Sequence, residues 1–367
     1  MTNWKYKLSV LLITMVLVLL SCSRSKNSNP GISYISLKNT YPGKYLSLNS
    51  TNSRLFAVFS NHEIENLSLF SIDIGKSLIK QHIKITPVDV IDTSPEINPF
   101  FGNHFFLITG SRMDLFYTDQ QTEEKFILKW MSRKNINEPW SVNTLKPAGF
   151  MVAAIPYTGD RILSIWNSDK LYYRILYSKS MLEGSLNKQY IFIDDISVIA
   201  NGNFYGFLSF ERTTNSLMLF SFKNNKLYEK RLADFGRVQF ASADKSGNIN
   251  ILAYKSKTNE LIILNGRNSY FKQTKLTLAR LTNSVYFFSN SRTTYYVYDE
   301  FSLDKKKRPI YQISLLFSKK GAFHKVILFH SKEEISKFKA YSVEGKLYIL
   351  LINKGLKFIE ILINKID

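Results

Sequence analysis

The chain has 367 residues, of which 45% are hydrophobic and 14% aromatic, and it carries a formal net charge of +20. This content of hydrophobic and aromatic residues excludes an intrinsically disordered chain, and the 27 Phe and 21 Tyr favour β-strands. The single cysteine excludes an internal disulfide, so a hydrophobic core has to stabilise the fold.

The N-terminal residues have the features of a secretory signal. Lys5 and Lys7 precede a mainly apolar run over residues 8–20, which ends at the small residue Ser21, followed by Cys22. The run is shorter than the roughly 20 residues that span a bilayer, which disfavours a permanent membrane helix. We therefore predict a signal peptide at residues 1–21.

The spacing of Leu19, Ser21 and Cys22 resembles a bacterial lipobox, which implies that Cys22 is lipidated, as with palmitate. Two or three acyl chains hold a protein durably on a membrane. The alternatives are a signal peptide with an incidental cysteine and a buried core thiol. Ser23 after the cysteine resembles an outer-membrane sorting signal. The resemblance thus implies a protein that is lipid-anchored to the outer membrane, on the periplasmic side rather than at the cell surface.

The residues after the cysteine predict a tether followed by one domain. The run from Ser23 to Gly31 is polar and lacks aromatic and branched apolar residues, so residues 22–32 should form a lipidated, flexible tether. The folded domain is expected at residues 33–367. Without Lys5 and Lys7 the net charge is +18, which favours anionic partners such as lipid head groups, acidic glycans or acidic proteins. The alternative is a lysine-rich surface that reflects an AT-rich genome.

From Ser33 onward, short apolar bursts alternate with turn-forming clusters, a pattern typical of strands and turns. Strand pairs recur with starts at residues 55, 105, 162, 204, 249, 285 and 347. A four-stranded propeller blade takes about 40 to 50 residues. The sequence therefore predicts an all-β fold, a single β-propeller of about seven or eight four-stranded blades. A further strand pair at 310–317 and 325–329 either belongs to one of the seven blades or forms an eighth blade. The alternative folds are a pair of β-sandwiches and a β-helix.

Local patterns add further predictions. Ser331–Phe338 and Ser178–Leu186 are candidate short helices. Residues 240–252 hold an Asp-x-x-Gly-Asn turn between two strands, which resembles the inner-strand turns of bacterial β-propellers. The turn at residues 158–160, Thr-Gly-Asp, is a looser relative. Adjacent aromatic pairs, such as Tyr172 with Tyr173 and residues 295 and 296, should place one ring in the core and one on a recognition face.

No motif supports catalysis or a cofactor. The five histidines form no metal-binding pair, and the sequence lacks a Gly-x-Ser-x-Gly elbow and a phosphate-binding Gly-rich loop. Asp194 and Asp195 are adjacent, so in a strand they face opposite sides. We therefore expect a non-enzymatic protein without cofactor or metal.

The densest run of charge is Lys305, Lys306, Lys307 and Arg308, between two predicted strands. Four cations in one loop predict a site for phosphate or sulfate groups on a membrane or a glycan, with an affinity that falls with salt. The alternative is a solvated loop tip.

A lipobox followed by strand pairs at the spacing of propeller blades resembles the BamB family, the lipoprotein propeller subunit of the outer-membrane β-barrel assembly machinery. This resemblance implies a scaffold that binds other envelope proteins, as an accessory subunit in outer-membrane protein assembly. The composition also resembles spirochaete-type lipoproteins, which implies a surface lipoprotein that binds acidic glycans or host matrix. A propeller hydrolase or lyase acting on envelope glycans is a third hypothesis. Nucleic acid is not expected as a partner, because of the compartment.

Overall fold

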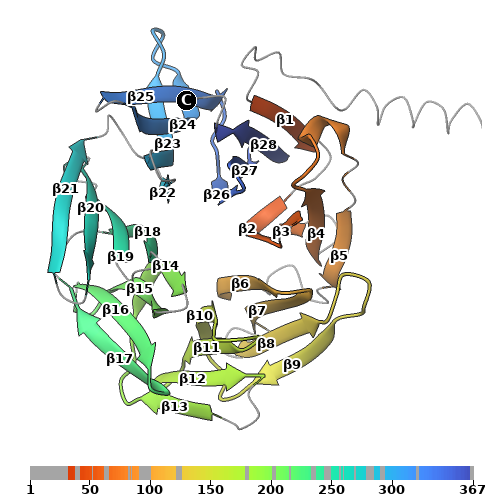
Figure 1. The fold of residues 1–367 in the computed structure, drawn as a ribbon, viewed down its shortest axis with the longest axis vertical. Helices are drawn as coiled ribbons and strands as arrows, with labels where there is room; N and C mark the ends of the chain where they lie inside the picture. Colours follow the sequence, from red (N-terminus) through yellow and green to blue (C-terminus); the bar gives the residue numbers. More distant parts are fainter. Residues whose placement is uncertain are drawn as a thin grey trace, which may run out of the picture. The chain divides into compact units, whose positions relative to one another are not determined.

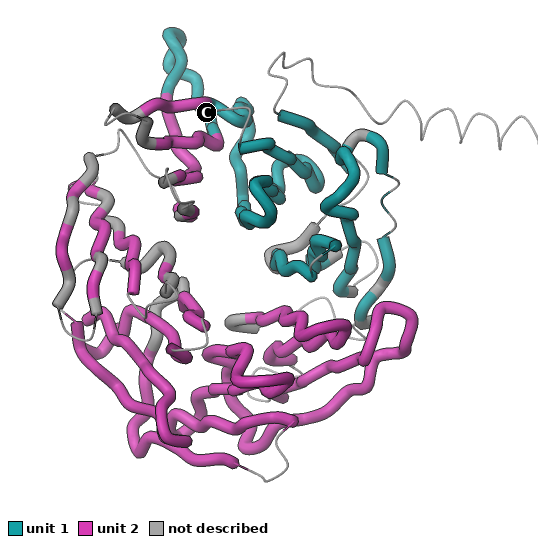
Figure 2. The backbone as a smooth tube through the Cα atoms, in the orientation of Figure 1, with its two compact units in different colours: residues 1–90, 303–312, 327–367 teal, residues 91–302, 313–326 magenta. Residues whose placement is uncertain are grey.

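The structure is a computed structural model, and nearly all of its described residues lie in strands or in the turns that join them. It describes residues 32–37, 42–51, 53–61, 66–81, 83, 85–90, 101–120, 126–177, 182–200, 204–214, 216–232, 237–243, 249–255, 258, 260–267, 270–277, 285–289, 294–319 and 322–363. Two compact units divide the chain, one of residues 1–90, 303–312 and 327–367 and the other of residues 91–302 and 313–326 (Figure 2).

The strands form seven four-stranded sheets, which we call blades 1 to 7 (Figure 1). Blade 1 contains β2 (Pro42–Ser50), β3 (Arg54–Asn61), β4 (Asn66–Asp73) and β5 (Ile85–Val90). The 3-10 turn η1 (Leu78–Lys80) lies between its last two strands. Blade 7 contains β26 (Lys337–Val343), β27 (Lys346–Ile352), β28 (Leu356–Leu362) and β1 (Ile32–Leu37).

The other five blades each use four consecutive strands. Blade 2 contains β6 (Phe101–Thr109), β7 (Arg112–Gln120), β8 (Phe126–Arg133) and β9 (Ser141–Leu145). Blade 3 contains β10 (Phe150–Pro156), β11 (Ile162–Asn167), β12 (Leu171–Leu176) and β13 (Leu182–Leu186). Blade 4 contains β14 (Phe192–Ala200), β15 (Tyr205–Glu211), β16 (Ser216–Lys223) and β17 (Lys226–Arg231). Blade 5 contains β18 (Arg237–Ala243), β19 (Ile249–Lys255), β20 (Glu260–Arg267) and β21 (Tyr270–Thr277). Blade 6 contains β22 (Val285–Ser289), β23 (Thr294–Leu303), β24 (Pro309–Lys319) and β25 (Ala322–Ser331).

The strand order identifies the architecture. In blades 1 to 6 neighbouring strands follow one another in the chain, whereas in blade 7 the N-terminal strand β1 pairs with β28. Six residue pairs, from Ile32 with Ile361 to Leu37 with Leu356, join these two strands, so both ends of the described chain contribute to one sheet. Seven four-stranded meanders, the last completed by the first strand, are the topology of a seven-bladed β-propeller. The predicted all-β propeller is confirmed, with seven blades in the described part of the chain.

The irregular spacing of the predicted strand pairs has a simple cause. The pairs that start at 105 and 285 are the first and second strands of blades 2 and 6, whereas the other five are second and third strands. The second strands of the seven blades begin at 54, 112, 162, 205, 249, 294 and 346, with steps of 43 to 58 residues. The pair at 310–317 and 325–329 corresponds to β24 and β25 of blade 6, and is therefore not an eighth blade.

Most second and third strands are buried on both faces. All residues of β11 except the last are buried, and the same holds for β27 except the first. Phe207 and Phe220 of blade 4 stack with their ring centroids 4.5 Å apart, in one cluster with Ile155 of blade 3. Tyr295 and Tyr296 are both buried, which corrects the expectation that one ring of each aromatic pair is exposed. The reason is that a strand between two sheets has no solvent face.

The helix expected at Ser331–Phe338 is absent. Ser331 ends β25, and Lys337 and Phe338 begin β26, where they pair with Ile352 and Leu351. A helix over this segment would need the backbone N–H groups of Lys337 and Phe338 to close its last turn, and both residues are held in this ladder instead. The second expected helix, Ser178–Leu186, contains strand β13 at residues 182–186, and its first four residues lie outside the described part.

One buried carboxylate predicts a measurable pH dependence. Burial alone raises the pKa of Glu211, but hydrogen bonds from Thr214 and Thr213 outweigh this effect and lower the pKa to about 2. Their backbone N–H groups lie 2.6 and 2.9 Å from the carboxylate. Because the pKa is lower in the folded state than in the unfolded state, the stabilisation is complete above about pH 5 and is lost as the pH falls towards 2.

Between pH 5 and pH 2 the free energy of unfolding should fall by about 2–3 kcal/mol less in Glu211→Gln than in the wild type. Urea unfolding at the two pH values measures this difference. Glu183→Gln, which removes a carboxylate whose side chain is 48% exposed, is the control. Equal acid sensitivity of the wild type and Glu211→Gln would contradict this assignment.

Candidate interaction surface

The two sites predicted from the sequence have different outcomes. Cys22, the proposed lipidation site, lies outside the described residues, as do the signal peptide and nearly all of the tether. The basic run 305–308 is described, and it forms the turn between β23 and β24. Lys305, Lys306 and Lys307 are exposed in this turn.

Arg308 differs from the three lysines because Asp304 binds it. Asp304 Oδ2 accepts hydrogen bonds from Arg308 Nε and Nη2, each at 2.8 Å. Its Oδ1 accepts from the backbone N–H groups of Lys306 and Arg308, also at 2.8 Å. The backbone hydrogen bond from Arg308 is the main cause that lowers the pKa of Asp304. The predicted cluster of four cations is therefore a rigid turn that presents three lysine ammonium groups.

A second group of polar side chains, which the sequence analysis did not single out, lies between blades 2 and 3. Asp114 in β7 is fully buried, and its carboxylate accepts three hydrogen bonds. The donors are Arg112 Nε at 2.9 Å, Trp130 Nε1 at 2.9 Å and the Tyr177 hydroxyl at 2.7 Å. The Arg112 guanidinium lies 3.6 Å from the centroid of the Tyr177 ring, and the Trp130 ring meets that ring edge-on at 5.2 Å. Asp114 thereby fixes one arginine and two aromatic rings.

Tyr177 has an unusual backbone conformation. Its φ is 60°, in the left-handed region that non-glycine residues rarely adopt, and its side chain is 40% exposed. Such a conformation costs about 1–3 kcal/mol and persists only where surrounding contacts impose it. Burial and the hydrogen bond to Asp114 raise the pKa of the Tyr177 hydroxyl, which keeps it protonated as a donor. The contacts of Asp114 and Arg112 hold this partly exposed ring in place.

The same surface continues between blades 3 and 4. Arg112 also donates a hydrogen bond to the backbone carbonyl of Asp160, in the turn that joins β10 to β11. The next residue, Arg161, lies 5.2 Å from the centroid of the Tyr157 ring. The Tyr157 ring in turn meets the Tyr205 ring edge-on at 4.7 Å. A continuous series of contacts thus runs from Tyr177 to Tyr205 across three successive blades.

We call this set the Arg–Tyr surface, composed of Arg112, Trp130, Tyr157, Arg161, Tyr177 and Tyr205. Its members gather because the turn after the first strand and the turn after the third strand of a meander lie at the same end of the sheet. Gly110, with a φ of 61°, closes the two-residue turn that precedes Arg112. Gly159, with a φ of 69°, lies in the turn that holds Tyr157 and Arg161. The hairpin turns of blades 2 and 3 therefore place Arg112, Tyr157 and Arg161, whereas Trp130 and Tyr205 lie in strands β8 and β15.

The Arg–Tyr surface is rich in the residue types that are enriched at protein interfaces. Trp, Tyr and Arg dominate the residues that carry most of the binding energy at interfaces. Tyr and Trp also offer large rigid contact areas with few side-chain torsions to immobilise. Five of the six residues are half-buried and the sixth is exposed, so they are supported from below and accessible from outside.

The sequence contained a weak signal for this surface. The turn at residues 158–160 resembles propeller turns, and its two flanking residues are Tyr157 and Arg161. The related turn at residues 244–248 lies outside the described part, between β18 and β19. The whole surface is not visible in the sequence, because its members are 93 positions apart at the extremes and only the blade topology brings them together.

The described residues offer little support for a metal site, a membrane-spanning helix or a pair of catalytic carboxylates. Within that part of the chain, no group of three or more His, Cys, Asp or Glu side chains is placed to hold a metal ion. Among the same residues, no helix combines the length and hydropathy needed to cross a bilayer. Asp194 and Asp195 lie next to each other in β14, and their side chains are outside the described set.

Comparisons with known proteins support the fold. No family model matches the chain, and no curated protein matches it. The structure is similar to one described as YCF48 bound to D1 peptide, with 12% identity, a TM-score of 0.54 and coverage of 93% of this chain and 98% of that one. It is also similar to YCF48 from Cyanidioschyzon merolae, with 8% identity, a TM-score of 0.55 and coverage of 90% and 98%. The chain is a seven-bladed β-propeller, and at these identities the likeness extends to the fold alone.

Proposed function

We propose that the protein is a non-enzymatic scaffold of the bacterial envelope that binds other envelope proteins through its Arg–Tyr surface. In this proposal Cys22 carries the lipid anchor, the protein lies on the periplasmic side of the outer membrane, and it serves as an accessory subunit in outer-membrane protein assembly. The observation that carries the proposal is the surface itself, in which a buried carboxylate and strained backbone hold arginine and aromatic side chains ready for a partner. Pre-organised side chains of this kind reduce the entropy lost on binding.

The comparisons are consistent with this proposal. One structure of the same fold is described as bound to a peptide. Propellers offer many turns at each end of their sheets, and binding residues concentrate on such turns when a rigid sheet supports them. The enzyme hypothesis, a hydrolase or lyase acting on envelope glycans, has no comparable group of residues behind it in the described part of the chain.

The test is affinity purification of the tagged protein from cross-linked cells, with mass spectrometry of the proteins recovered. We expect the wild type to recover an envelope protein, in particular a barrel-assembly protein, and Tyr157→Leu to lose it. Leucine keeps the apolar packing of the partly buried Tyr157, so the fold is preserved. Tyr172→Leu is the matched control, because Tyr172 is also half-buried and near a cation, Lys170 at 5.8 Å, at the opposite end of blade 3.

Each result of this purification has a defined meaning. If Tyr157→Leu recovers the same protein as the wild type, the Arg–Tyr surface is not the binding surface. If the wild type recovers no protein, the scaffold function itself is wrong. Recovery of envelope proteins without a barrel-assembly protein would support the scaffold and overturn the role in outer-membrane protein assembly.

A second candidate function rests on the basic turn. Asp304 neutralises Arg308 but leaves Lys305, Lys306 and Lys307 exposed, without an ion pair among the described residues. We propose that these lysines bind acidic glycans or lipid head groups, as a surface lipoprotein would require.

The triple variant Lys305→Ala, Lys306→Ala, Lys307→Ala tests this candidate. It should lower heparin affinity about tenfold or more at physiological salt, because three nearby ammonium groups act together on one polyanion. The matched control removes three other exposed lysines that form no ion pair with a described residue, Lys80, Lys134 and Lys332. Equal losses in both triple variants would show that the charge acts without a defined site.

A further inference from the structure

We infer that the Arg–Tyr surface binds an acidic polypeptide segment and that the guanidinium of Arg161 receives one of its carboxylates. The inference rests on the proposed function, because it names the chemical class of the partner that this surface binds. It separates Arg161 from Arg112, the other arginine of the surface, whose charge the protein itself neutralises.

Arg112 has a buried counter-ion and Arg161 has none. Arg112 Nε donates to the fully buried Asp114, and the Arg112 side chain is only 17% exposed. The Arg161 guanidinium instead donates to uncharged groups, with Nε 2.9 Å from the Thr158 carbonyl and Nη2 2.5 Å from the Thr158 hydroxyl. Among the described residues, no carboxylate forms an ion pair with Arg161. Arg161 is therefore the cation of this surface that a partner can neutralise.

The geometry of Arg161 favours a carboxylate. The two hydrogen bonds to Thr158 and the neighbouring Tyr157 ring fix the guanidinium in one orientation. Its other Nη group makes no hydrogen bond to a described residue. A fixed guanidinium binds carboxylates with short, charge-assisted hydrogen bonds, and less side-chain entropy is lost when it is already oriented. Tyr157 and Tyr205 lie beside it as apolar contacts for the rest of the segment.

The charges around Arg161 also favour an acidic partner. The Tyr157 ring contacts Phe222 at 5.5 Å, and Phe222 is followed by a tight turn that carries the exposed Lys223 and Lys226. Both turn residues between these lysines, 224 and 225, have a positive φ, as a two-residue turn of this kind requires. Neither lysine forms an ion pair with another described residue. Three uncompensated cations thus flank the two tyrosines.

Asp160 carries an opposing charge next to Arg161 in the chain, and it gives the inference a second test. Its side chain is exposed, and its carboxylate forms no ion pair among the described residues. An acidic partner bound at Arg161 is repelled by Asp160. Removing the Asp160 charge should therefore strengthen the binding of an acidic partner, whereas removing the Arg161 charge should weaken it.

The experiment measures fluorescence anisotropy of a labelled poly-L-glutamate of about 20 residues, enough to follow the surface across three blades, since an extended chain spans about 3.3 Å per residue. The protein carries alanine at positions 305, 306 and 307, so that the basic turn does not contribute. We expect Arg161→Gln to lower the affinity about tenfold, Arg161→Lys to lower it about threefold, and Asp160→Asn to raise it about twofold. These differences should shrink in about 1 M salt, where the Debye length is about 3 Å.

Several outcomes would overturn the inference. Unchanged affinity in Arg161→Gln would remove Arg161 from the binding site. A loss of heparin binding in Arg161→Gln as large as the loss of poly-L-glutamate binding would indicate a general polyanion site instead of a polypeptide site. In cells, Arg161→Gln should lose the protein that the wild type recovers. If Arg161→Gln retains it while Tyr157→Leu loses it, the inference fails and the proposed function stands.

Discussion

Replacing Asp114 by alanine should lower the free energy of unfolding by about 3–5 kcal/mol, the range for removing one partner of a buried ion pair. The variant removes the acceptor of three hydrogen bonds and leaves the largely buried guanidinium of Arg112 without a counter-ion. It also releases Trp130 and Tyr177, so the Tyr177 backbone loses the contacts that hold its positive φ. Urea unfolding followed by circular dichroism measures the effect.

Asp160→Ala is the control for this prediction. Asp160 contacts Arg112 only through its backbone carbonyl, and alanine retains this carbonyl. We expect a change within about 0.5 kcal/mol. The double variant Arg112→Ala, Asp114→Ala should be less destabilised than the sum of the single variants, because neither charge is then left unpaired. A loss below about 1 kcal/mol in Asp114→Ala would mean that the cluster does not support the surface.

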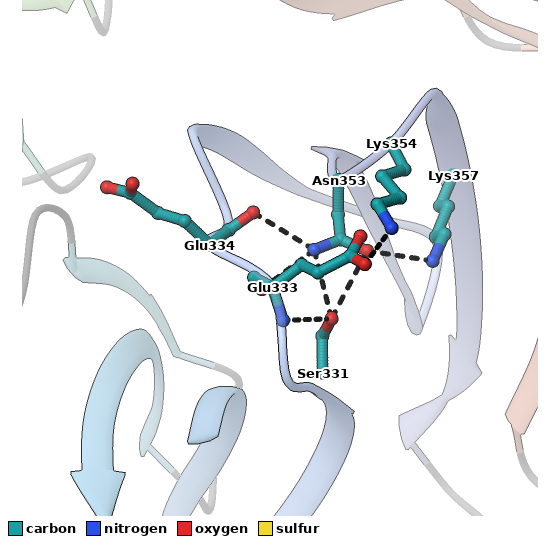
Figure 3. Close-up of polar contacts among 6 residues, drawn as sticks. All are labelled: Ser331, Glu333, Glu334, Asn353, Lys354 and Lys357. Carbon is teal, nitrogen blue, oxygen red and sulfur yellow. Dashed lines mark hydrogen bonds and ion pairs between the residues drawn. The ribbon is translucent and has the colours of Figure 1, made fainter. Parts of the chain in front are cut away.

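The second large effect is expected at Asn353, in the turn between β27 and β28. Figure 3 shows its side chain between Ser331, Lys357 and the chain at Glu333 and Glu334. Asn353 is 3% exposed, and its Nδ2 donates to the Glu333 and Glu334 carbonyls at 2.9 and 3.0 Å. Its Oδ1 accepts from Lys357 Nζ at 3.0 Å. The Asn353 side chain thus binds two carbonyls that would have accepted intrahelical hydrogen bonds if residues 331–338 formed a helix.

We expect Asn353→Ala to lower the free energy of unfolding by about 2–4 kcal/mol, since it leaves two carbonyls and one ammonium group without this partner. Asn353→Asp should be at least as destabilising, because it replaces a donor by a carboxylate that faces the same two carbonyls. The control is the exposed pair of Lys354 and Glu333, whose replacement by alanine should cost about 1 kcal/mol or less. A cost for Asn353→Ala no larger than that of the control would contradict the role of Asn353.

The architecture was predictable because it depends on local signals. Apart from the pairing of β1 with β28 in blade 7, each blade consists of hairpins between consecutive strands, and apolar bursts separated by turn residues mark these hairpins in the sequence. The short helix expected at Ser331–Phe338 was wrong because Asn353, 15 residues beyond that segment, binds two of its carbonyls. No local pattern reveals a contact of that kind.

The candidate surface was less predictable for the same reason. The run 305–308 stood out because its charges are consecutive, yet the structure shows that Asp304 neutralises one of them. Arg112 and Tyr177 are 65 positions apart, and they meet only because blades 2 and 3 pack side by side within one compact unit. Surfaces assembled from several blades leave no continuous sequence motif.

Site-specific photo-cross-linking in living cells determines directly whether a partner protein binds at the Arg–Tyr surface. The photoreactive residue replaces Asp160, which is exposed on the surface, or Asp169, which is exposed in the turn at the opposite end of blade 3. We expect a discrete cross-linked species with an envelope protein from position 160 and none from position 169. Cross-links from position 169 alone, or from neither position, would contradict it.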